Sequence, residues 1–190
     1  MPGSKDLLTT TSFHMEVSTV TVLETAKKMI DYSHGNLHDI NHFMKVYAYA
    51  KMIADGEQLD PDTQKLVEMT ALVHDIACPL CRVKYGNTNG KNQEKESAAL
   101  IAEFFKDSNL PQDFTDRISF LVSHHHTLDQ IDGIDYQIII EADYLVNADE
   151  SHFSGHNIKN MYDKIFKTET GKKIVKEMFF PEAFQKSETW

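Results

Sequence analysis

Residues 71–76 read Ala-Leu-Val-His-Asp-Ile, which places a histidine next to an aspartate at the end of an apolar run. We predict that this run is the last part of a buried helix, which Pro79 stops. Because neighbouring helical residues point about 100° apart, the His74 imidazole and the shorter Asp75 carboxylate can converge on one ion. An imidazole nitrogen and a carboxylate oxygen suit both borderline and hard divalent cations. The pair is therefore a candidate for part of a metal site.

The other patterned segments also predict helices, and no stretch shows sustained two-residue alternation. Between residues 41 and 54 the apolar positions follow the spacing of one helical face; they are Phe43, Val46, Tyr47, Ala50 and Ile53. Further helices are predicted to begin at Asp60-Pro61 and near residues 94, 112, 136, 158 and 172. The polar stretch between residues 76 and 93 is rich in Gly and Asn and predicts a long loop, which could act as a lid. The fold class that follows is all-α, a single compact helical bundle.

Length and charge restrict the partners of the chain. With 190 residues we expect one domain, at 1–190, with a core at about 37–150 and a C-terminal helical extension at 151–190. The formal net charge is -10 and basic residues cluster only in pairs, which argues against binding to duplex nucleic acid. No apolar stretch approaches the roughly 20 residues that span a bilayer, and no signal-peptide pattern opens the chain. We therefore expect a cytoplasmic protein without a membrane partner, and a homo-oligomer stays open.

Asp143 lies on an apolar helical face, where an unpaired charge costs several kcal/mol. It follows Ile139 and Ile140 by four and three residues and precedes Val146 by three, so it faces inward with them. A buried aspartate needs a partner, which is a metal ion, a salt bridge or a helix-capping contact. Periodicity alone leaves these alternatives open.

The order of these residues resembles the HD-domain superfamily of metal-dependent phosphohydrolases. His42 is followed by His74-Asp75 and, well downstream, by Asp143. The segments that carry the resemblance are 38–46 (His-Asp-Ile-Asn-His-Phe-Met-Lys-Val), 71–76 and 141–147 (Glu-Ala-Asp-Tyr-Leu-Val-Asn). The resemblance implies a helical domain in which these four side chains hold one divalent ion, which is Mn, Fe, Co, Ni, Zn or Mg. It also implies hydrolysis of a phosphorylated compound by metal-activated water, with Asp75 acting catalytically on that water.

The number of metal ions depends on residues outside this set of four. Binuclear members of the family carry extra histidines after the polar loop and near the position of His124 and His125. Here Gln93 stands at the loop position where the resemblance implies a histidine, and an amide oxygen replaces imidazole poorly at a borderline ion. One metal is therefore expected rather than two, and His124 and His125 become candidates for binding substrate phosphate or water. His38, Gln93 and Glu94 are kept as candidates for supporting the first metal or binding a second.

Basic residues near the motifs are candidates for holding phosphate. Lys45 replaces an arginine that some family members carry three residues after the first ligand, and it can bind phosphate as a point charge. Arg82 and Lys84 are placed in the predicted loop, where they could close over a phosphate or simply be solvated. Cys78 stands where some nucleotidase-type members carry a glutamate. This departure weakens assignment to that subgroup.

The function implied is metal-dependent hydrolysis of a small phosphorylated metabolite, and we expect a nucleotide. Besides a dinuclear oxygenase on the same scaffold, which would require two irons, two alternatives remain from the sequence. The first is a regulatory module that binds metal and nucleotide without turnover, because Cys78 and Gln93 depart from the family pattern. The second is a binuclear HD phosphodiesterase, in which the extra histidines hold another ion.

Overall fold

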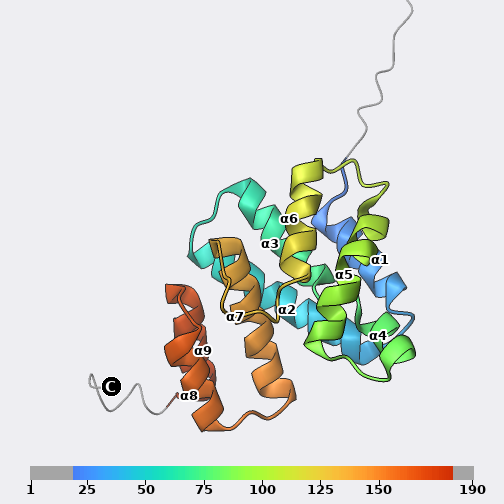
Figure 1. Ribbon diagram of the computed structural model, residues 1–190. Helices are drawn as coiled ribbons and strands as arrows, with labels where there is room; N and C mark the ends of the chain where they lie inside the picture. Colours follow the sequence, from blue (N-terminus) through green and yellow to red (C-terminus); the bar gives the residue numbers. More distant parts are fainter. Residues whose placement is uncertain (1–18, 182–190) are drawn as a thin grey trace, which may run out of the picture.

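The computed structural model describes residues 19–181, and every regular element in that range is a helix (Figure 1). The prediction of an all-α fold is thereby confirmed. The helices are α1 (Val22–Tyr32), α2 (Leu37–Gly56), α3 (Pro61–Val73), α4 (Cys78–Tyr85), α5 (Gly90–Phe105), α6 (Gln112–Val122), α7 (Ile134–Glu150), α8 (Gly155–Lys164) and α9 (Glu169–Phe179). No helix among the described residues has the length and apolar character needed to cross a membrane. The predicted domain also includes residues 1–18 and 182–190, which lie outside the described range.

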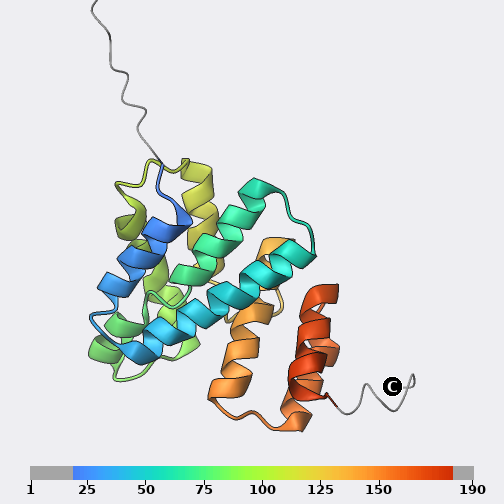
Figure 2. The ribbon, with the colours of Figure 1, turned by 180° about the vertical axis from the view of Figure 1, so that it is seen from behind.

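Helices α2, α3 and α7 form the centre of the molecule. Helix α2 packs most extensively on α3 and α7 and runs diagonally across the face seen in Figure 2. Figure 1 shows α7 with α5 and α6 on one side and α8 and α9 on the other. The three central helices contribute to both buried apolar clusters, one with α8 and α9 and the other with α1, α5 and α6. Side chains on the central helices can therefore meet between the two clusters.

The predicted apolar face of α2 is buried, as its periodicity requires. Val46, Ala50 and Ile53 pack into the cluster that includes α8 and α9, whereas Phe43 packs into the cluster on the other side. Tyr47 is only partly buried and contacts both. The wide apolar face of α2 therefore packs into an apolar cluster on each of two sides.

Side chains cap the starts of several helices. Asp60 accepts the backbone N–H groups of Asp62 and Thr63, each at 3.1 Å, so the predicted start of α3 is confirmed. Helix α1 did not follow from the periodicity. Its signal was a capping box, in which Thr21 accepts Glu24 N at 3.2 Å and Glu24 accepts Thr21 N at 2.8 Å.

The region after α3 differs from the sequence-based prediction in three ways. Helix α3 ends at Val73 rather than at residue 76, and residues 74–77 form a turn. Pro79 does not stop a helix; it lies in the first turn of α4, where its missing N–H has no intrahelical partner to lose. The predicted long loop is wrong, because α4 and α5 fill most of it and only residues 86–89 lie between them. Gly86, with a φ of 68°, supplies the left-handed residue that ends α4.

The C-terminal helices are attached to α7 through a buried carboxylate. Glu141 Oε1 accepts Lys167 N at 2.6 Å, Thr168 N at 3.0 Å and Gln137 Nε2 at 2.7 Å, while Glu141 Oε2 accepts the Thr168 hydroxyl. A Cβ at Gly171 would lie 2.0 Å from Glu141 Oε2, so only glycine permits this approach. Hydrogen bonds to a charged, buried group hold the start of α9 against α7.

Candidate metal centre

His42 projects from α2 into the space between α3 and α7. Its Nδ1 lies 2.9 Å from Glu150 Oε2 at the end of α7, and a carboxylate can only accept, so Nδ1 carries the hydrogen. Its Nε2 points the other way, 3.3 Å from His74 Nε2 and 3.2 Å from Asp143 Oδ1. Glu150 therefore fixes which nitrogen of His42 faces the cluster.

His74 is oriented in the same manner, but its Nδ1 is held by a backbone carbonyl group instead of a carboxylate. Its fully buried ring donates from Nδ1 to the carbonyl oxygen of Ala71 at 2.8 Å. Its Nε2 consequently faces the carboxylates, 3.5 Å from Asp143 Oδ1 and 3.8 Å from Asp75 Oδ2. Although His74 and Asp75 lie in the turn after α3 and not within the helix, both side chains reach the same point.

The separations between these donor atoms suit a bound cation. His42 Nε2 also lies 3.6 Å from Asp75 Oδ2, and ligand atoms of His42, His74 and Asp75 all lie within 4.8 Å of one another. Asp143 Oδ1 adjoins this group through the two imidazoles, at 3.2 Å from His42 Nε2 and 3.5 Å from His74 Nε2. Donors at about 2.1 Å from one ion are about 3.0 Å apart in octahedral and about 3.4 Å apart in tetrahedral coordination. Nitrogen and oxygen donors of this kind bind divalent ions, and the residues therefore fit the metal that the resemblance implied.

The electrostatics of the cluster also favour a positive charge. Burial acts to lower the pKa of His42, but its hydrogen bond to Asp143 and the charges of Asp75 and Asp143 raise it to about 9. Burial acts to raise the pKa of Asp143, and the adjacent His42 and His74 rings nevertheless hold it well below its usual range. The pKa of Asp75 is lowered against burial by His74, His125 and His42. Both carboxylates are thus ionised. Without a metal, the His42 ring would carry a second proton, on Nε2, in addition to the one on Nδ1.

His125 and His126 lie on the other side of Asp75. His125 is buried, its Nδ1 donates to Val122 O at 2.8 Å, and its Nε2 lies 3.6 Å from Asp75 Oδ1 with no hydrogen-bond partner. Ligand atoms of Asp75, His125 and His126 all lie within 4.8 Å of one another. His126 was not predicted as a site residue. Its only signal was its place in the histidine triplet.

His124 is not brought to the cluster. Its ring stacks on Phe120 at a centroid distance of 4.3 Å, and its Nδ1 donates to Phe120 O at 2.7 Å. Its backbone oxygen accepts the Tyr136 hydroxyl. The contacts of His124 therefore belong to the packing of α6 on α7 rather than to the site.

The three residues kept as support for a metal occupy different positions. Gln93 lines the same cavity as His42; its Nε2 donates to Thr88 O at 3.0 Å, and its buried Oε1 has no hydrogen-bond partner. His38 lines that cavity from an exposed position, with its Nδ1 3.7 Å from Asp39 Oδ1. Glu94 instead accepts the hydroxyl of Thr127 at 2.9 Å. Of the three, Gln93 has the polar atom that most needs a partner.

The candidate phosphate-binding cations are each paired with a carboxylate. Lys45 donates to Glu150 Oε1 at 2.9 Å and Lys84 to Glu96 Oε1 at 2.8 Å. Arg82 forms two bonds to Asp39, at 2.6 and 2.5 Å. Arg82 and Lys84 lie on α4, so their expected position in a loop was wrong.

A polar cavity of about 260 Å³ opens onto the cluster. Arg82 is the one lysine or arginine among its described lining residues, whereas Lys45 and Lys84 lie outside that lining. The lining residues come mainly from α2, α4 and α7, and are His38, Asp39, His42, Asp75, Cys78, Arg82, Thr88, Gln93, His126, Asp143, Asn147, Glu150 and Ser151. Glu150, Asp39 and Asn147 were missed from the sequence, because their partners are distant along the chain or, for Asn147, because the bond to Asp143 resembles an ordinary helical contact.

Comparisons with known proteins identify similar folds and a family. A search of curated proteins returned no significant match. Similar solved structures include a predicted HD superfamily hydrolase from an uncultured Thermotogales bacterium, with a TM-score of 0.58 and 21% identity over 86% of this chain and 87% of that one. YpgQ of Bacillus subtilis has a TM-score of 0.56 and 19% identity over 83% of this chain and 88% of its own. At these identities the two structures show the fold.

The family described as HD domain matches residues 39–154. This range is more than half of the chain, and it contains His42, the His74-Asp75 pair and Asp143. The resemblance seen in the sequence is confirmed, and the chain belongs to the HD domain family.

Proposed function

We propose that this protein is a metal-dependent phosphohydrolase that acts on a small phosphorylated metabolite, and that a nucleotide is the expected substrate. The proposed ligands of one divalent ion are His42, His74, Asp75 and Asp143. One observation carries the proposal: two imidazole Nε2 atoms face each other at 3.3 Å while both Nδ1 atoms donate elsewhere. Two imidazole nitrogens beside two ionised carboxylates favour a positive charge, and a divalent ion would supply it in place of the proton that His42 otherwise holds.

The chemistry divides between the ion and the chain. A divalent ion at this position would lower the pKa of a water molecule and neutralise charge on phosphoryl oxygens. Asp75 directs Oδ2 toward His42 and His74 and Oδ1 toward His125, so Oδ1 is the proposed acceptor of the proton from an attacking water. Arg82 lines the cavity and has the planar donors that suit phosphate, with Asp39 holding its guanidinium in place.

A binuclear phosphodiesterase is the second candidate, because His125 repeats the pattern seen at the first site. Its Nδ1 donates to the backbone oxygen of Val122, and its Nε2, which has no hydrogen-bond partner, lies 3.6 Å from Asp75 Oδ1. The buried Oε1 of Gln93, also without a partner, lines the adjoining cavity. One ion remains our proposal, because glutamine is a weaker ligand than the histidine it replaces.

Metal analysis combined with a phosphate-release screen tests the proposal. The protein is stripped with chelator, reloaded with Mn²⁺, and assayed for phosphate and pyrophosphate release over a panel of nucleotides and sugar phosphates. We expect one equivalent of metal, and turnover that chelator abolishes. Two equivalents would support the binuclear candidate, and nucleotide binding without any product would support the regulatory module instead.

Asp143→Asn is the decisive variant, with Asp149→Asn as its control. Asp149 lies on the same helix but is exposed, so its substitution should leave turnover unchanged. Asp143→Asn removes a charged donor from the cluster and should lower turnover by at least about 100-fold. Full turnover by a soluble, metal-loaded Asp143→Asn protein would contradict the proposal.

A further inference from the structure

The cluster lies between two adjoining cavities of different character. The polar cavity extends toward α2, α4 and α5, whereas a second one, of about 310 Å³, extends toward α8 and the residues that follow α6. His126, Asp143 and Asn147 line both. A molecule held at the cluster through phosphate can therefore reach the second cavity without leaving the first.

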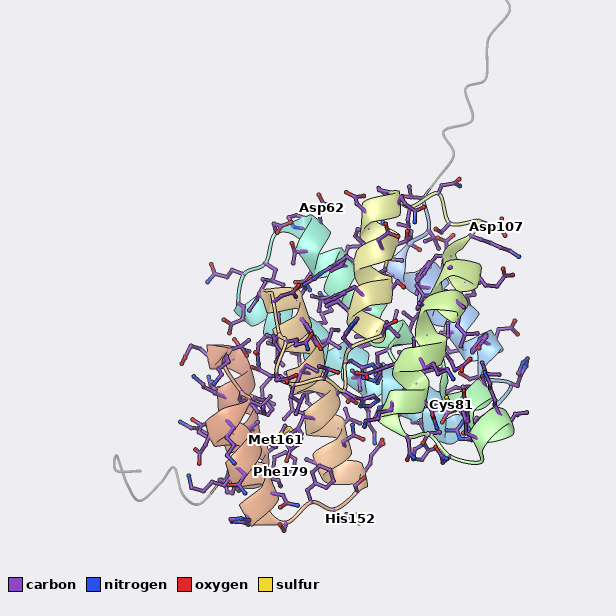
Figure 3. All side chains as sticks on the ribbon, in the orientation of Figure 1. Asp62, Cys81, Asp107, His152, Met161 and Phe179 are labelled. Carbon is purple, nitrogen blue, oxygen red and sulfur yellow. The ribbon has the colours of Figure 1, made fainter. Side chains whose placement is uncertain are left out.

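The second cavity is walled mainly by apolar side chains. Five of them come from α7, α8 and the segments before each helix: Leu128, Ile140, Tyr144, Phe153 and Met161. Met161, labelled in Figure 3, extends from α8 on the side that faces α7. No lysine or arginine is among the described lining residues, in contrast to Arg82 in the polar cavity. A second phosphate would find no cation there, and it would face Asp143.

Two aromatic rings give the apolar cavity a surface for stacking. The Tyr144 and Phe153 rings are 5.6 Å apart between centroids, with their planes inclined by 55°. At the border with the polar cavity, Asn147 Nδ2 donates to Asp143 Oδ1 at 2.8 Å, so the amide oxygen points away from that carboxylate. That oxygen is an acceptor suited to an exocyclic amine. The combination suits a flat heterocycle better than an alkyl chain.

We propose that the apolar cavity binds the nucleobase of a phosphorylated substrate whose phosphates lie in the polar cavity. The inference rests on the proposed function, since it needs phosphate bound beside the metal. Phe153 is the residue that distinguishes a base from other apolar groups, because a ring stacks on a base whereas an aliphatic side chain does not. Loss of one stacking partner typically weakens binding by about 5-fold or more.

Three matched diphosphonates test this assignment on Mn²⁺-loaded protein by titration calorimetry. They are methylenediphosphonate, its adenosine ester and its geranyl ester. All three contain two phosphonate groups joined by a methylene bridge, which cannot be hydrolysed. We expect the adenosine ester to bind about 10-fold more tightly than the parent compound, with a smaller gain for the geranyl ester. In Phe153→Leu, which keeps an apolar side chain, the gain from adenosine should fall to about 2-fold, while affinity for the parent compound stays constant. Phe114→Leu, at a half-buried phenylalanine in a different cavity, should change none of these affinities.

Each other outcome overturns the inference in a recognisable way. Binding of the parent compound with no gain from adenosine, or a gain that Phe153→Leu leaves intact, rejects the nucleobase site but not the proposed function. A geranyl gain equal to the adenosine gain identifies an alkyl site instead. If none of the three compounds binds, phosphate binding at the metal fails, and the inference fails with it.

Discussion

Glu150 is expected to control metal affinity although it lies outside the set of proposed ligands. One of its oxygens accepts His42 Nδ1 and the other accepts Lys45 Nζ, both at 2.9 Å. Removing a carboxylate that orients a metal-binding histidine typically weakens metal binding about 10- to 100-fold. For Glu150→Ala we expect the upper end, about 100-fold or about 2.7 kcal/mol, because His42 loses both its orientation and the charge that makes Nε2 basic.

Glu150→Gln should cost about 10-fold in affinity, or about 1.4 kcal/mol, even though it keeps the side-chain size. An amide has one accepting and one donating end, so it cannot accept from both His42 and Lys45. If the donating end faces His42, the ring must carry its hydrogen on Nε2, where it would compete with the metal. If it faces Lys45, two donors oppose each other. Lys45→Ala removes that conflict, and we expect the double variant to bind metal more tightly than Glu150→Gln alone.

The assay is Mn²⁺ titration calorimetry on chelator-stripped proteins at one pH, with circular dichroism melts to verify folding. Asp149→Asn, an exposed neighbour on the same helix, should bind Mn²⁺ within about twofold of the parent protein, as surface substitutions usually do. Folded Glu150→Ala protein with unchanged Mn²⁺ affinity would refute the orienting role. A loss in Lys45→Ala as large as that in Glu150→Ala would refute the explanation through His42.

Three other predictions concern the surroundings of the cluster. Gly90→Ala should lower turnover several-fold while metal affinity changes little, because the new Cβ would lie 2.6 Å from the His126 ring; steady-state kinetics and Mn²⁺ titration separate the two effects. Mn²⁺ binding at pH 7 should release about one proton, and affinity should weaken up to about tenfold per pH unit below 9, because the pKa of His42 is raised to about 9 in the metal-free cluster and the metal must displace its proton. Calorimetry in buffers of different ionisation enthalpy counts the proton, and no release at pH 7 would contradict this. Glu141→Ala should lower the free energy of unfolding by about 3–5 kcal/mol in urea titrations, because the N–H groups before α9 lose their buried acceptor; a loss below about 1 kcal/mol would mean that water replaces it.

The local periodicity of the sequence was sufficient for most helices and for the clearest site residue. Apolar spacing predicted the buried face of α2, and it placed Asp143 on the inner face of α7 beside Ile139 and Ile140. Both results follow from the 3.6-residue turn, which relates residues close in the chain. The same reasoning failed at the junction between α3 and α4, because Pro79 can either end a helix or begin one.

Pairings between distant residues were beyond any local pattern. Glu150 lies 108 residues from His42, and Asp39 lies 43 residues from Arg82. Taken by itself, each carboxylate is only a charged residue near one end of a helix, which is common on any protein surface. Lys45 and Arg82 looked free to bind phosphate for the same reason, and folding paired each with a carboxylate.

The sequence by itself determined the all-α fold, the order of the HD motif and the inward direction of Asp143. Only the tertiary structure decided that Glu150 orients His42, that His126 rather than His124 approaches Asp75, and that an apolar cavity adjoins the polar one. The physical reason is that helix formation depends on neighbours within a few turns. The protonation and direction of an imidazole instead depend on whichever group the packing of α2 against α7 brings to its other nitrogen.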